Sequence, residues 1–476
     1  MNGSTRLAPF VASMLAAIVV AACGDAEPVP VVTDEGLAPV VTAEGFLAIT
    51  SSAVRIAEMK PPKPAYSGLA VSQPFGTRIR RITGDPDTPI VTPSGDVIGM
   101  WTAVSRHHYV TTQAWNADGS LMHIYLGREE VSPNNLILSG GSYQPLYAYY
   151  ASRRDSRWHP TDPAIRVVIA GDTLSWQNVE TSLIQRTWQL PYEQNIAGGK
   201  WNVSADGRYL GIVGDNRYIY AFDMSTKRGR AGPPFDLRTD CGLPSCDPPN
   251  KWVDLRTASD ALHFLVHYGP ESNWRVLRAD ATTLAISHRV FPSSLRPAEC
   301  DAGLICSPGL PADGFLPVLF GHPDFLVNTD GSMWVVGQSK YWSKKTGSAV
   351  DTVNGKSGAI LGINIDAGAI KSLTDPDDEA WATHVSVRST QRPGWVYASY
   401  NRAPLGKFMG EILAVNLNDL CVERYAHHFS ATQGCYDCEV HPSPSPDGSK
   451  VAFASTWGED QSLVQGYVLE LLADPD

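Results

Sequence analysis

The stretch "PSPDGSKVAFAST" (residues 444–456) joins a tight turn to a short apolar strand. Asp447 and Gly448 suit such a turn, because both residue types tolerate a positive φ. The alternating residues after them are typical of a hairpin strand. The same combination of a turn and a short strand recurs at "WNADGSLMHIYL" (115–126), "WHPTDPAIRVVIA" (158–170), "VSADGRYLGIVG" (203–214), "RTASDALHFLVH" (256–267), "VNTDGSMWVVGQ" (327–338) and "TQRPGWVYASY" (390–400).

The spacing of these turns predicts the fold. Successive turns are between 44 and 70 residues apart, whereas one four-stranded propeller blade takes about 40–50 residues. Insertions fall where the cysteine-bearing segments lie, at 230–250 and 296–312, and we expect them to be surface loops. We therefore predict an all-β, seven-bladed β-propeller over residues 73–476, with "TPIVTPSGDVIGMWTAV" (88–104) pairing with the C-terminal "GYVLELL" to close the ring. A β-sandwich followed by a second domain is the structural alternative.

Composition excludes one class of function. The 476 residues carry a net charge of −11, and only 18% of them are charged. Nucleic-acid binding depends on clustered Lys and Arg, so no nucleic-acid partner is expected. The 41 glycines and 35 prolines favour a turn-rich β protein.

The N-terminus reads as a targeting segment. Arg6 precedes the apolar stretch "LAPFVASMLAAIVVAAC" (7–23). This resembles a bacterial lipoprotein signal, with Val20-Ala21-Ala22-Cys23 as its lipobox. The resemblance implies that residues 1–22 are removed, that Cys23 is lipidated and that the protein is anchored to the outer membrane, on its periplasmic or surface face. An ordinary cleaved signal peptide is the alternative, and residues 23–72 are expected to be a partly disordered tether.

Seven cysteines follow Cys23, and export favours disulfides. Cys241 with Cys246 and Cys300 with Cys306 are expected to close small loops. Cys421, Cys435 and Cys438 leave an odd number, whose pairing the sequence does not decide. Cys435 and Cys438 have the spacing of either a loop disulfide or half of a zinc site.

Several motifs resemble those of known propellers. "SPDGSKVAFAST" resembles the PD40 repeat of TolB-type propellers. The region from about residue 75 to 470 resembles β-propeller polysaccharide lyases, such as oligogalacturonate lyases and certain ulvan lyases. That resemblance rests, in chain order, on "RHHYVTTQAWNADGS", "RWHPTDP", "GHPDF", "THVSVRSTQRPGWVYAS" and "EVHPSPSPDG".

The resemblance implies a divalent metal site. In that family, histidines near the central channel hold the ion. The positions of this chain that match are His322, His384 and His441, with Glu439 in the place of a family glutamine. Carboxylate and imidazole ligands suit Mn²⁺, Zn²⁺ or, with more oxygens, Ca²⁺.

Positions along the strands agree with this assignment. A residue six positions before the turn aspartate is expected beside the channel, as His441 is before Asp447 and Asp324 before Asp330. Glu439 and His441 share one face of an extended chain. His384 lies nine residues before Pro393 and needs a bulge or a longer turn to reach the channel. The structural alternative is that these histidines only hydrogen-bond neighbouring blades.

A lyase also needs groups that transfer protons and bind the carboxylate. His107 and His108, with Tyr109, precede the first repeated turn, and His108 is the predicted base or acid. In "YAYYASRRDSRWHP", Tyr150 is a predicted acid, and Arg154 is predicted to meet the carboxylate of an acidic substrate. The alternative for this stretch is a half-buried strand with solvated arginines.

We therefore predict an envelope-anchored, monomeric carbohydrate-active propeller. Its predicted activity is metal-assisted cleavage of a uronate-containing polysaccharide by β-elimination. The alternative function is a non-catalytic, TolB-like propeller that binds a protein or glycan partner at the envelope.

Overall fold

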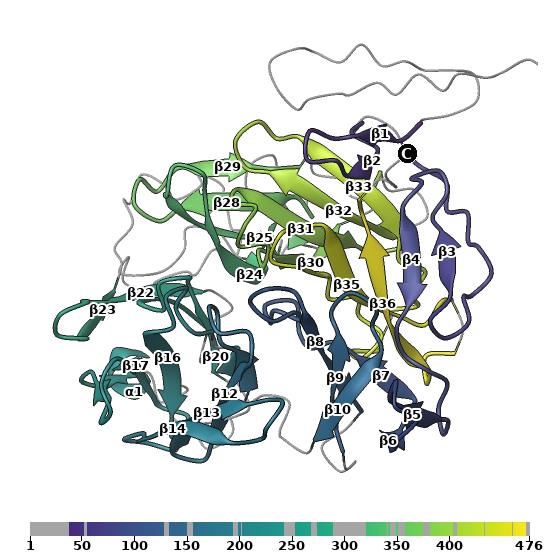
Figure 1. Ribbon diagram of the computed structural model, residues 1–476. Helices are drawn as coiled ribbons and strands as arrows, with labels where there is room; N and C mark the ends of the chain where they lie inside the picture. The colour runs from purple at the N-terminus through teal and green to yellow at the C-terminus, as the bar shows by residue number, and fades with distance from the viewer. Residues whose placement is uncertain are drawn as a thin grey trace, which may run out of the picture.

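The computed structural model describes residues 38–51, 55–127, 133–149, 156–193, 199–200, 202–241, 253–267, 274–288, 320–339, 341–342, 349–350, 358–374, 381–402, 407–432, 434–458 and 460–472. Their regular structure is β-strand, apart from one short helix, α1 (Leu237–Cys241) (Figure 1). Within these ranges, no helix has the length and apolar content that a membrane crossing requires.

Sheets of antiparallel strands follow one another along the chain, each mostly pairing strands in sequence order. The first contains β7 (Val104–Arg106), β8 (Leu121–Leu126), β9 (Asn135–Ser139) and β10 (Pro145–Tyr149). The second contains β11 (Ser156–Trp158), β12 (Ile165–Ala170), β13 (Thr173–Asn178) and β14 (Ile184–Gln189). The third contains β16 (Tyr209–Gly214), β17 (Tyr218–Asp223), β18 (Arg230–Ala231) and β19 (Phe235–Asp236).

The succession continues in the second half of the chain. The fourth sheet contains β20 (Asp254–Thr257), β21 (His263–His267), β22 (Arg275–Ala279) and β23 (Ile286–His288), with β15 (Gly199–Lys200) parallel to β20. The fifth contains β24 (Phe320–Val327), β25 (Met333–Ser339), β28 (Ile360–Asn364) and β29 (Ile370–Ser372), and β26 (Tyr341–Trp342) pairs with β27 (Ala349–Val350) separately. The sixth contains β30 (Ala382–Ser386), β31 (Trp395–Tyr400), β32 (Glu411–Asn416) and β33 (Val422–His427).

The last sheet, called here the closing sheet, combines both ends of the chain. It contains β34 (Ser443–Pro444), β35 (Lys450–Ser455), β36 (Val464–Glu470), β4 (Arg78–Arg81) and β3 (Leu69–Val71). The partner of β36 is therefore β4, and the expectation for residues 88–104 was wrong. There β5 (Pro89–Val91) and β6 (Val97–Met100) pair with each other, because a tight turn between them makes a local hairpin. The end of this segment reaches β36: Val104, in β7, pairs with Val464 in parallel, and the Ala103 carbonyl accepts a hydrogen bond from the Val464 backbone N at 2.8 Å. Through this pair the closing sheet is hydrogen-bonded to the first sheet.

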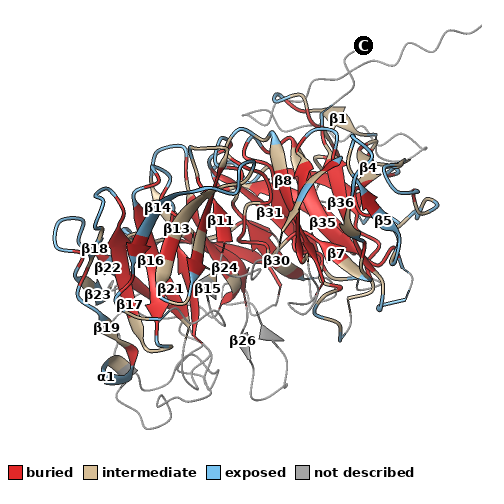
Figure 2. Ribbon diagram, turned by 60° about the horizontal axis from the view of Figure 1, so that its bottom comes forward, coloured by how far each residue is buried: buried red, intermediate tan, exposed pale blue. Residues whose placement is uncertain are grey.

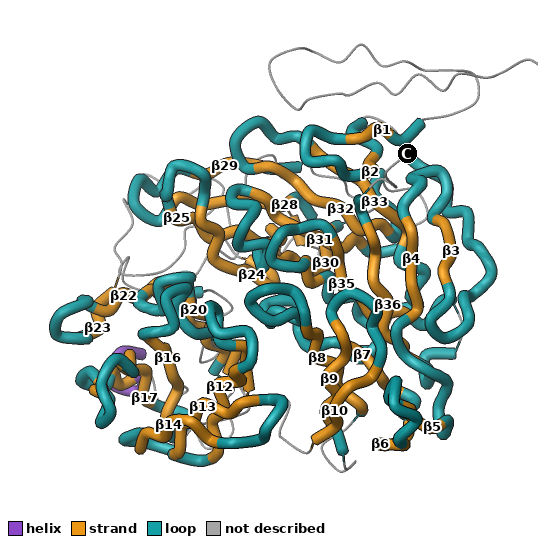
Figure 3. The backbone as a smooth tube through the Cα atoms, in the orientation of Figure 1, coloured by secondary structure: helices purple, strands orange, loops and turns teal. Residues whose placement is uncertain are grey.

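Six of the seven predicted turns lie between the first two strands of their sheets, and loops occupy the strand ends (Figure 3). The turn at Asp206-Gly207 lies directly before β16 and is flanked by an isolated bridge between Val203 and Leu210. Gly119 and Gly448 have φ values of 72° and 76°, which glycine adopts at little cost. The preceding aspartates hold the turns: Oδ1 of Asp118 accepts a hydrogen bond from the backbone N of Ser120 at 2.9 Å. These local contacts explain why the motif could be read from sequence.

Apolar clusters between neighbouring sheets form the core, and buried residues extend through the strands (Figure 2). They join the second sheet to the third, and so on through the sixth sheet to the closing sheet. Ala452 and Val468 of the closing sheet pack with Ile124 and Leu138 of the first. The last sheet thus packs on the first, which brings chain segments distant in sequence together.

The predicted tether is in part a packed segment. Residues 38–51 include β1 (Val40–Val41) and β2 (Leu47–Ala48), and Phe46 is buried against the sixth and closing sheets. Ile49 and Arg424 exchange two backbone hydrogen bonds at 3.0 Å. The expectation of a tether through residue 72 is therefore corrected for the described residues from 38 onward. Cys23, the signal over 1–22 and residues 23–37 lie outside the described residues.

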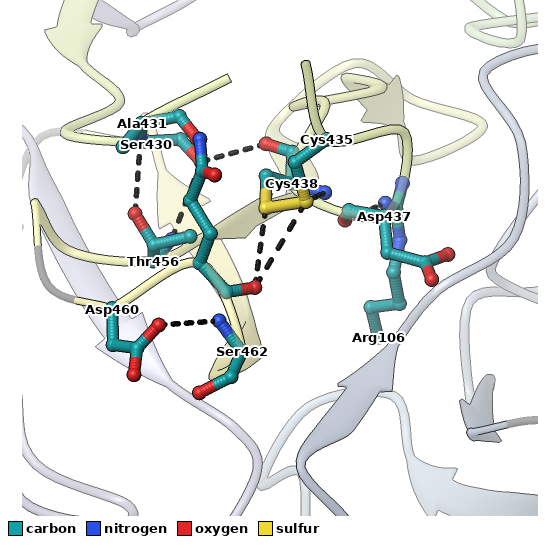
Figure 4. Close-up of a disulfide and its surroundings, with 10 residues drawn as sticks. Arg106, Ser430, Ala431, Cys435, Asp437, Cys438, Thr456, Asp460 and Ser462 are labelled. Atoms are coloured by element: carbon teal, nitrogen blue, oxygen red, sulfur yellow. Dashed lines mark hydrogen bonds between the residues drawn. A yellow bond between two sulfur atoms is a disulfide. The ribbon is translucent and has the colours of Figure 1, made fainter. Parts of the chain in front are cut away.

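Cys435 and Cys438 form a disulfide (Figure 4). The spacing therefore belongs to a loop disulfide, and the zinc alternative is wrong. Cys421 is also disulfide-bonded. The predicted pairs Cys241–Cys246 and Cys300–Cys306 involve residues outside the described ranges.

Candidate metal centre

The three predicted histidines lie at the starts of three consecutive sheets. His322 is in β24, His384 is in β30, and His441 lies two residues before β34. The pairing register shifts between Gly321 and Asp324, and again between Ala382 and His384. A bulge of this kind re-aims a side chain. The bulge that the sequence required for His384 is therefore present.

Two of these histidines have unusual backbone conformations. His322 has a φ of 50° and His441 a φ of 46°. The left-handed region costs a residue with a Cβ about 1–3 kcal/mol and persists only where surrounding contacts impose it. The fold thus holds both imidazoles in place at the expense of local backbone strain.

The side chains converge. The ring centroids of His322 and His384 are 4.2 Å apart, and those of His384 and His441 are 4.3 Å apart. Oε2 of Glu439 lies 3.1 Å from Nε2 of His441 and 3.6 Å from Nε2 of His384. One ligand atom each of His384, Glu439 and His441 lie within 4.8 Å of one another.

This donor set fits a divalent ion. Ligands at about 2.1 Å from one metal lie about 3–3.5 Å from each other in a tetrahedral site, close to the separations seen. Two imidazoles and a carboxylate are nitrogen and oxygen ligands that Mn²⁺ and Zn²⁺ accept. Ca²⁺ prefers a shell of oxygens, which this set lacks.

Arg106 and His107, at the end of β7, contact His441 and fix its position. The Arg106 guanidinium donates to Nδ1 of His441 and to the carbonyl of Asp437 (Figure 4), and His107 contacts the His441 carbonyl. Burial, and then the Arg106 charge, hold the pKa of His441 well below its usual value. Neutral imidazole is the form that binds metals. Ligation through Nε2 would place the ring proton on Nδ1 and turn Arg106 toward Asp437.

Tyr109 lies against all three histidines. Its hydroxyl is 2.7 Å from Nδ1 of His322, and its ring is 4.8 Å from His441 and 5.7 Å from His384. Burial raises the pKa of Tyr109. The phenol is therefore protonated at neutral pH and can donate a hydrogen bond or a proton.

Two cationic residues flank Tyr109 on the other side. Nζ of Lys200 lies 4.2 Å from the centre of the Tyr109 ring, and Nη2 of Arg256 lies 3.5 Å from its hydroxyl. Both side chains also contact Asp254, Lys200 at 2.7 Å and Arg256 at 3.4 Å. Burial disfavours the Asp254 carboxylate, but the two cations outweigh it and lower its pKa. The group carries one more positive than negative charge, which favours an anionic ligand.

Other predicted residues lie elsewhere. Asp324 was expected beside the histidines, but it is buried in an ion pair with Arg388 at 2.9 Å. His108, the predicted base or acid, faces away from the centre, and its ring stacks on His123 at 4.7 Å. His107 contacts the His441 backbone. Tyr150 and Arg154 lie outside the described residues.

Lys200, Asp254 and Arg256 were missed, although the sequence contained a signal for two of them. Lys200 is six residues before Asp206, and Asp254 is six residues before Asp260. The offset that selected His441 and Asp324 would have selected both. No offset from a turn selects Arg256.

The geometry can now be compared with known proteins. No family model matches the chain, and no curated protein matches its sequence. Among solved structures, an oligogalacturonate lyase in complex with manganese covers 87% of this chain and 98% of its own, with a TM-score of 0.54 and 13% identity. The oligogalacturonate lyase of Vibrio parahaemolyticus has the same coverage, a TM-score of 0.53 and 10% identity.

These similarities show the fold. The chain is an all-β protein with a β-propeller fold like that of oligogalacturonate lyases, as its motifs indicated. At this identity the likeness does not assign an activity, which has to be argued from the side chains.

Proposed function

We propose that this protein is a metal-assisted lyase that cleaves a uronate-containing polysaccharide by β-elimination. The observation that carries the proposal is the convergence of His322, His384, His441 and Glu439 beside Tyr109, opposite the cations Lys200 and Arg256. The manganese-bound oligogalacturonate lyase of similar fold supports it.

Binding the substrate carboxylate is the first requirement of this chemistry. A bound divalent ion would act as a Lewis acid on the uronate carboxylate. His384, Glu439 and His441 would hold the ion. Lys200 and Arg256 would pair with the same carboxylate or with its neighbour on the chain. Neutralising this charge acidifies the proton on the adjacent carbon, the one that elimination removes.

Proton transfer is assigned to the hydrogen-bonded pair His322 and Tyr109. The sequence placed His322 among the ligands, but its Nδ1 contacts Tyr109 and it lies outside the compact donor group. We propose that the imidazole accepts the α proton while the bond to the leaving oxygen breaks and a carbon–carbon double bond forms. Tyr109 donates a proton to the leaving oxygen and recovers one from His322 along their hydrogen bond.

The finer architecture is part of the proposal. We propose that the six sheets and the closing sheet are seven propeller blades, with β4 completing the last one. We also propose export, a lipid anchor at Cys23 on the outer membrane, a monomeric state and an acidic polysaccharide or oligosaccharide as ligand.

A direct test is formation of the unsaturated product, followed by its ultraviolet absorbance over a panel of polyuronates with Mn²⁺ present. Product is expected from the wild-type protein, and Tyr109→Phe should lower kcat about 10²–10⁴-fold, the usual worth of a general acid. His288→Ala, on β23 at the outer edge of the fourth sheet, where His288 contacts Asp240, is the matched control. Metal binding without product on any polyuronate would favour the non-catalytic binding propeller instead.

A further inference from the structure

The junction between the first and second sheets is polar. Elsewhere in the described part of the chain, apolar clusters join neighbouring sheets. Between these two sheets, charged and polar side chains of β8 and β10 face those of β12. The backbone contacts there are a Trp158 indole bonded to the Ala114 carbonyl at 3.0 Å and an Asn116 amide bonded to the Pro163 carbonyl at 3.0 Å.

Arg166 is the unusual member of this junction. Its side chain is fully buried, with 2% of the residue exposed, and Nη2 donates to the Ser156 hydroxyl at 2.6 Å. The guanidinium lies over the Trp158 ring at 4.7 Å. Nε and Nη1 make no hydrogen bond of ordinary geometry. The Tyr149 side chain interacts with the charge, and no carboxylate of the described residues pairs with it. A buried charge without a counter-ion lowers the stability of the fold by several kcal/mol. An anion bound at Arg166 would therefore be stabilising.

The neighbours of Arg166 can also receive an anion. The Tyr149 side chain is close enough to interact with the guanidinium electrostatically, and its hydroxyl makes no hydrogen bond of ordinary geometry. His123 is 6.1 Å from the Tyr149 ring and stacks on His108. His108 and Tyr149 are both partly exposed. These two rings form the partly exposed side of the group.

We propose that Arg166, Tyr149 and His108 form an anion-binding subsite that takes one carboxylate group. Consecutive Cα atoms are about 3.8 Å apart, and side chains alternate along an extended chain. His108 in the subsite and Tyr109 in the metal centre thus belong to neighbouring positions on the same strand end. A chain with acidic groups on successive sugars would meet both sites at once. The identity of the ligand as an acidic sugar rests on the proposed function, whereas the anion site itself does not.

The first experiment uses acetate as the probe. Unfolding is followed at increasing sodium acetate, with sodium chloride keeping the ionic strength constant. A saturable stabilisation is expected in the wild-type protein. It should be much smaller in Arg166→Met, where Lys200 and Arg256 of the metal centre are the remaining cations that favour an anion. The variant itself should unfold no more easily than wild type, because it removes an unpaired buried charge.

Arg392→Met is the matched control, since Arg392 is a buried arginine paired with Glu423 at 2.8 Å. It should destabilise the protein and keep the acetate response. The inference is overturned if wild-type protein shows no saturable acetate effect, if Arg166→Met keeps that effect in full, or if Arg166→Met is as destabilised as Arg392→Met. Tyr149→Phe, which keeps the ring, should retain the fold and weaken the acetate response.

The second experiment compares galacturonate and trigalacturonate by calorimetry with Mn²⁺ present. A charge-assisted contact is worth about tenfold or more in affinity. Arg166→Met should therefore bind the trimer at least about tenfold more weakly than wild type and bind the monomer equally well. Equal trimer affinity in both proteins would overturn the inference. A saturable acetate effect without any sugar binding would overturn the proposed function alone, and His441→Ala should keep the acetate effect.

Discussion

Two groups of buried ionisable residues differ in how their charges are paired: one lies within the sixth sheet, and the other joins the fifth, sixth and closing sheets. In the first group, called here the paired network, Arg424 contacts both Glu411 oxygens at 2.7 and 2.5 Å. Arg392 contacts both Glu423 oxygens at 2.8 and 2.9 Å. Nε and Nη2 of Arg424 donate to the two Glu411 oxygens, the bidentate arrangement that is strongest for such a pair. Nη2 of Arg392 donates to both Glu423 oxygens.

In the metal centre, by contrast, groups of the same kind face one another. Imidazoles from three sheets converge, with a single carboxylate, and two of the histidines have a positive φ. This arrangement adds nothing obvious to stability without a ligand. Buried charge in the paired network is explained by the fold, whereas the convergence in the metal centre is explained by a function.

The largest expected effect is on the paired network. Arg424→Met leaves Glu411 buried without its cation, so the free energy of unfolding should fall by about 3–5 kcal/mol. Urea denaturation measures this. Replacing both residues, Arg424→Met with Glu411→Met, should recover most of the loss, and a double variant as unstable as the single one would contradict the pairing argument.

A substitution in the metal centre should change the affinity for a metal ion rather than the stability of the fold. His441→Ala removes a ligand atom, so the affinity for Mn²⁺ should fall about 100-fold or more, which is about 2.7 kcal/mol. Titration calorimetry measures it, with His288→Ala on β23 as control. The comparison between the two groups fails if His441→Ala leaves the affinity unchanged or destabilises the metal-free protein as much as Arg424→Met does.

Acid should destabilise the protein through His428. Burial lowers the pKa of His428 to about 4, below the unfolded value of about 6.5. The contribution of neutral His428 to the free energy of unfolding is therefore complete above about pH 6.5. It is lost as the pH falls toward 4, at up to about 1.4 kcal/mol per pH unit. His428→Gln, which does not titrate, should flatten the stability profile in this window.

Glu411 makes the free energy of unfolding change with pH in the opposite direction. Comparing wild type with His428→Gln removes this effect, because both proteins contain Glu411. Burial raises the pKa of Glu411 to about 7, so its contribution is complete below about pH 4.5 and is lost as the pH rises to 7. Parallel profiles for the two proteins would show that His428 is not buried in its neutral form.

The smallest expected effect concerns the disulfide beside the metal centre. Cys435 and Cys438 are three positions apart, so the loop they close is short and contributes little unfolded-state entropy. The Cys435→Ser, Cys438→Ser double variant should lose little stability. Its affinity for Mn²⁺ should fall about tenfold, because the disulfide orders the loop that leads to Glu439 and His441. An unchanged affinity would show that Arg106 and His107 hold His441 by themselves.

Sequence reasoning reached His441 and His384 because each has a fixed relation to a turn. It failed for Asp324, since the bulge after Gly321 changes which side chain faces the centre. It chose His108 over His107 and Tyr109, but alternation places neighbouring side chains on opposite sides of the chain. Tyr109 faces the metal centre and His108 faces β8.

The amino-acid sequence alone determined the repeated turns, the short strands after them and the kinds of donor atoms available. These depend on φ preferences and on hydrogen bonds within a few residues. Tertiary structure decided which strand closes the last sheet, that residues from 38 onward pack on the body, and that Lys200 and Arg256 lie across from the histidines. Those contacts join residues more than fifty positions apart, and they follow from how the sheets pack, which no local pattern encodes.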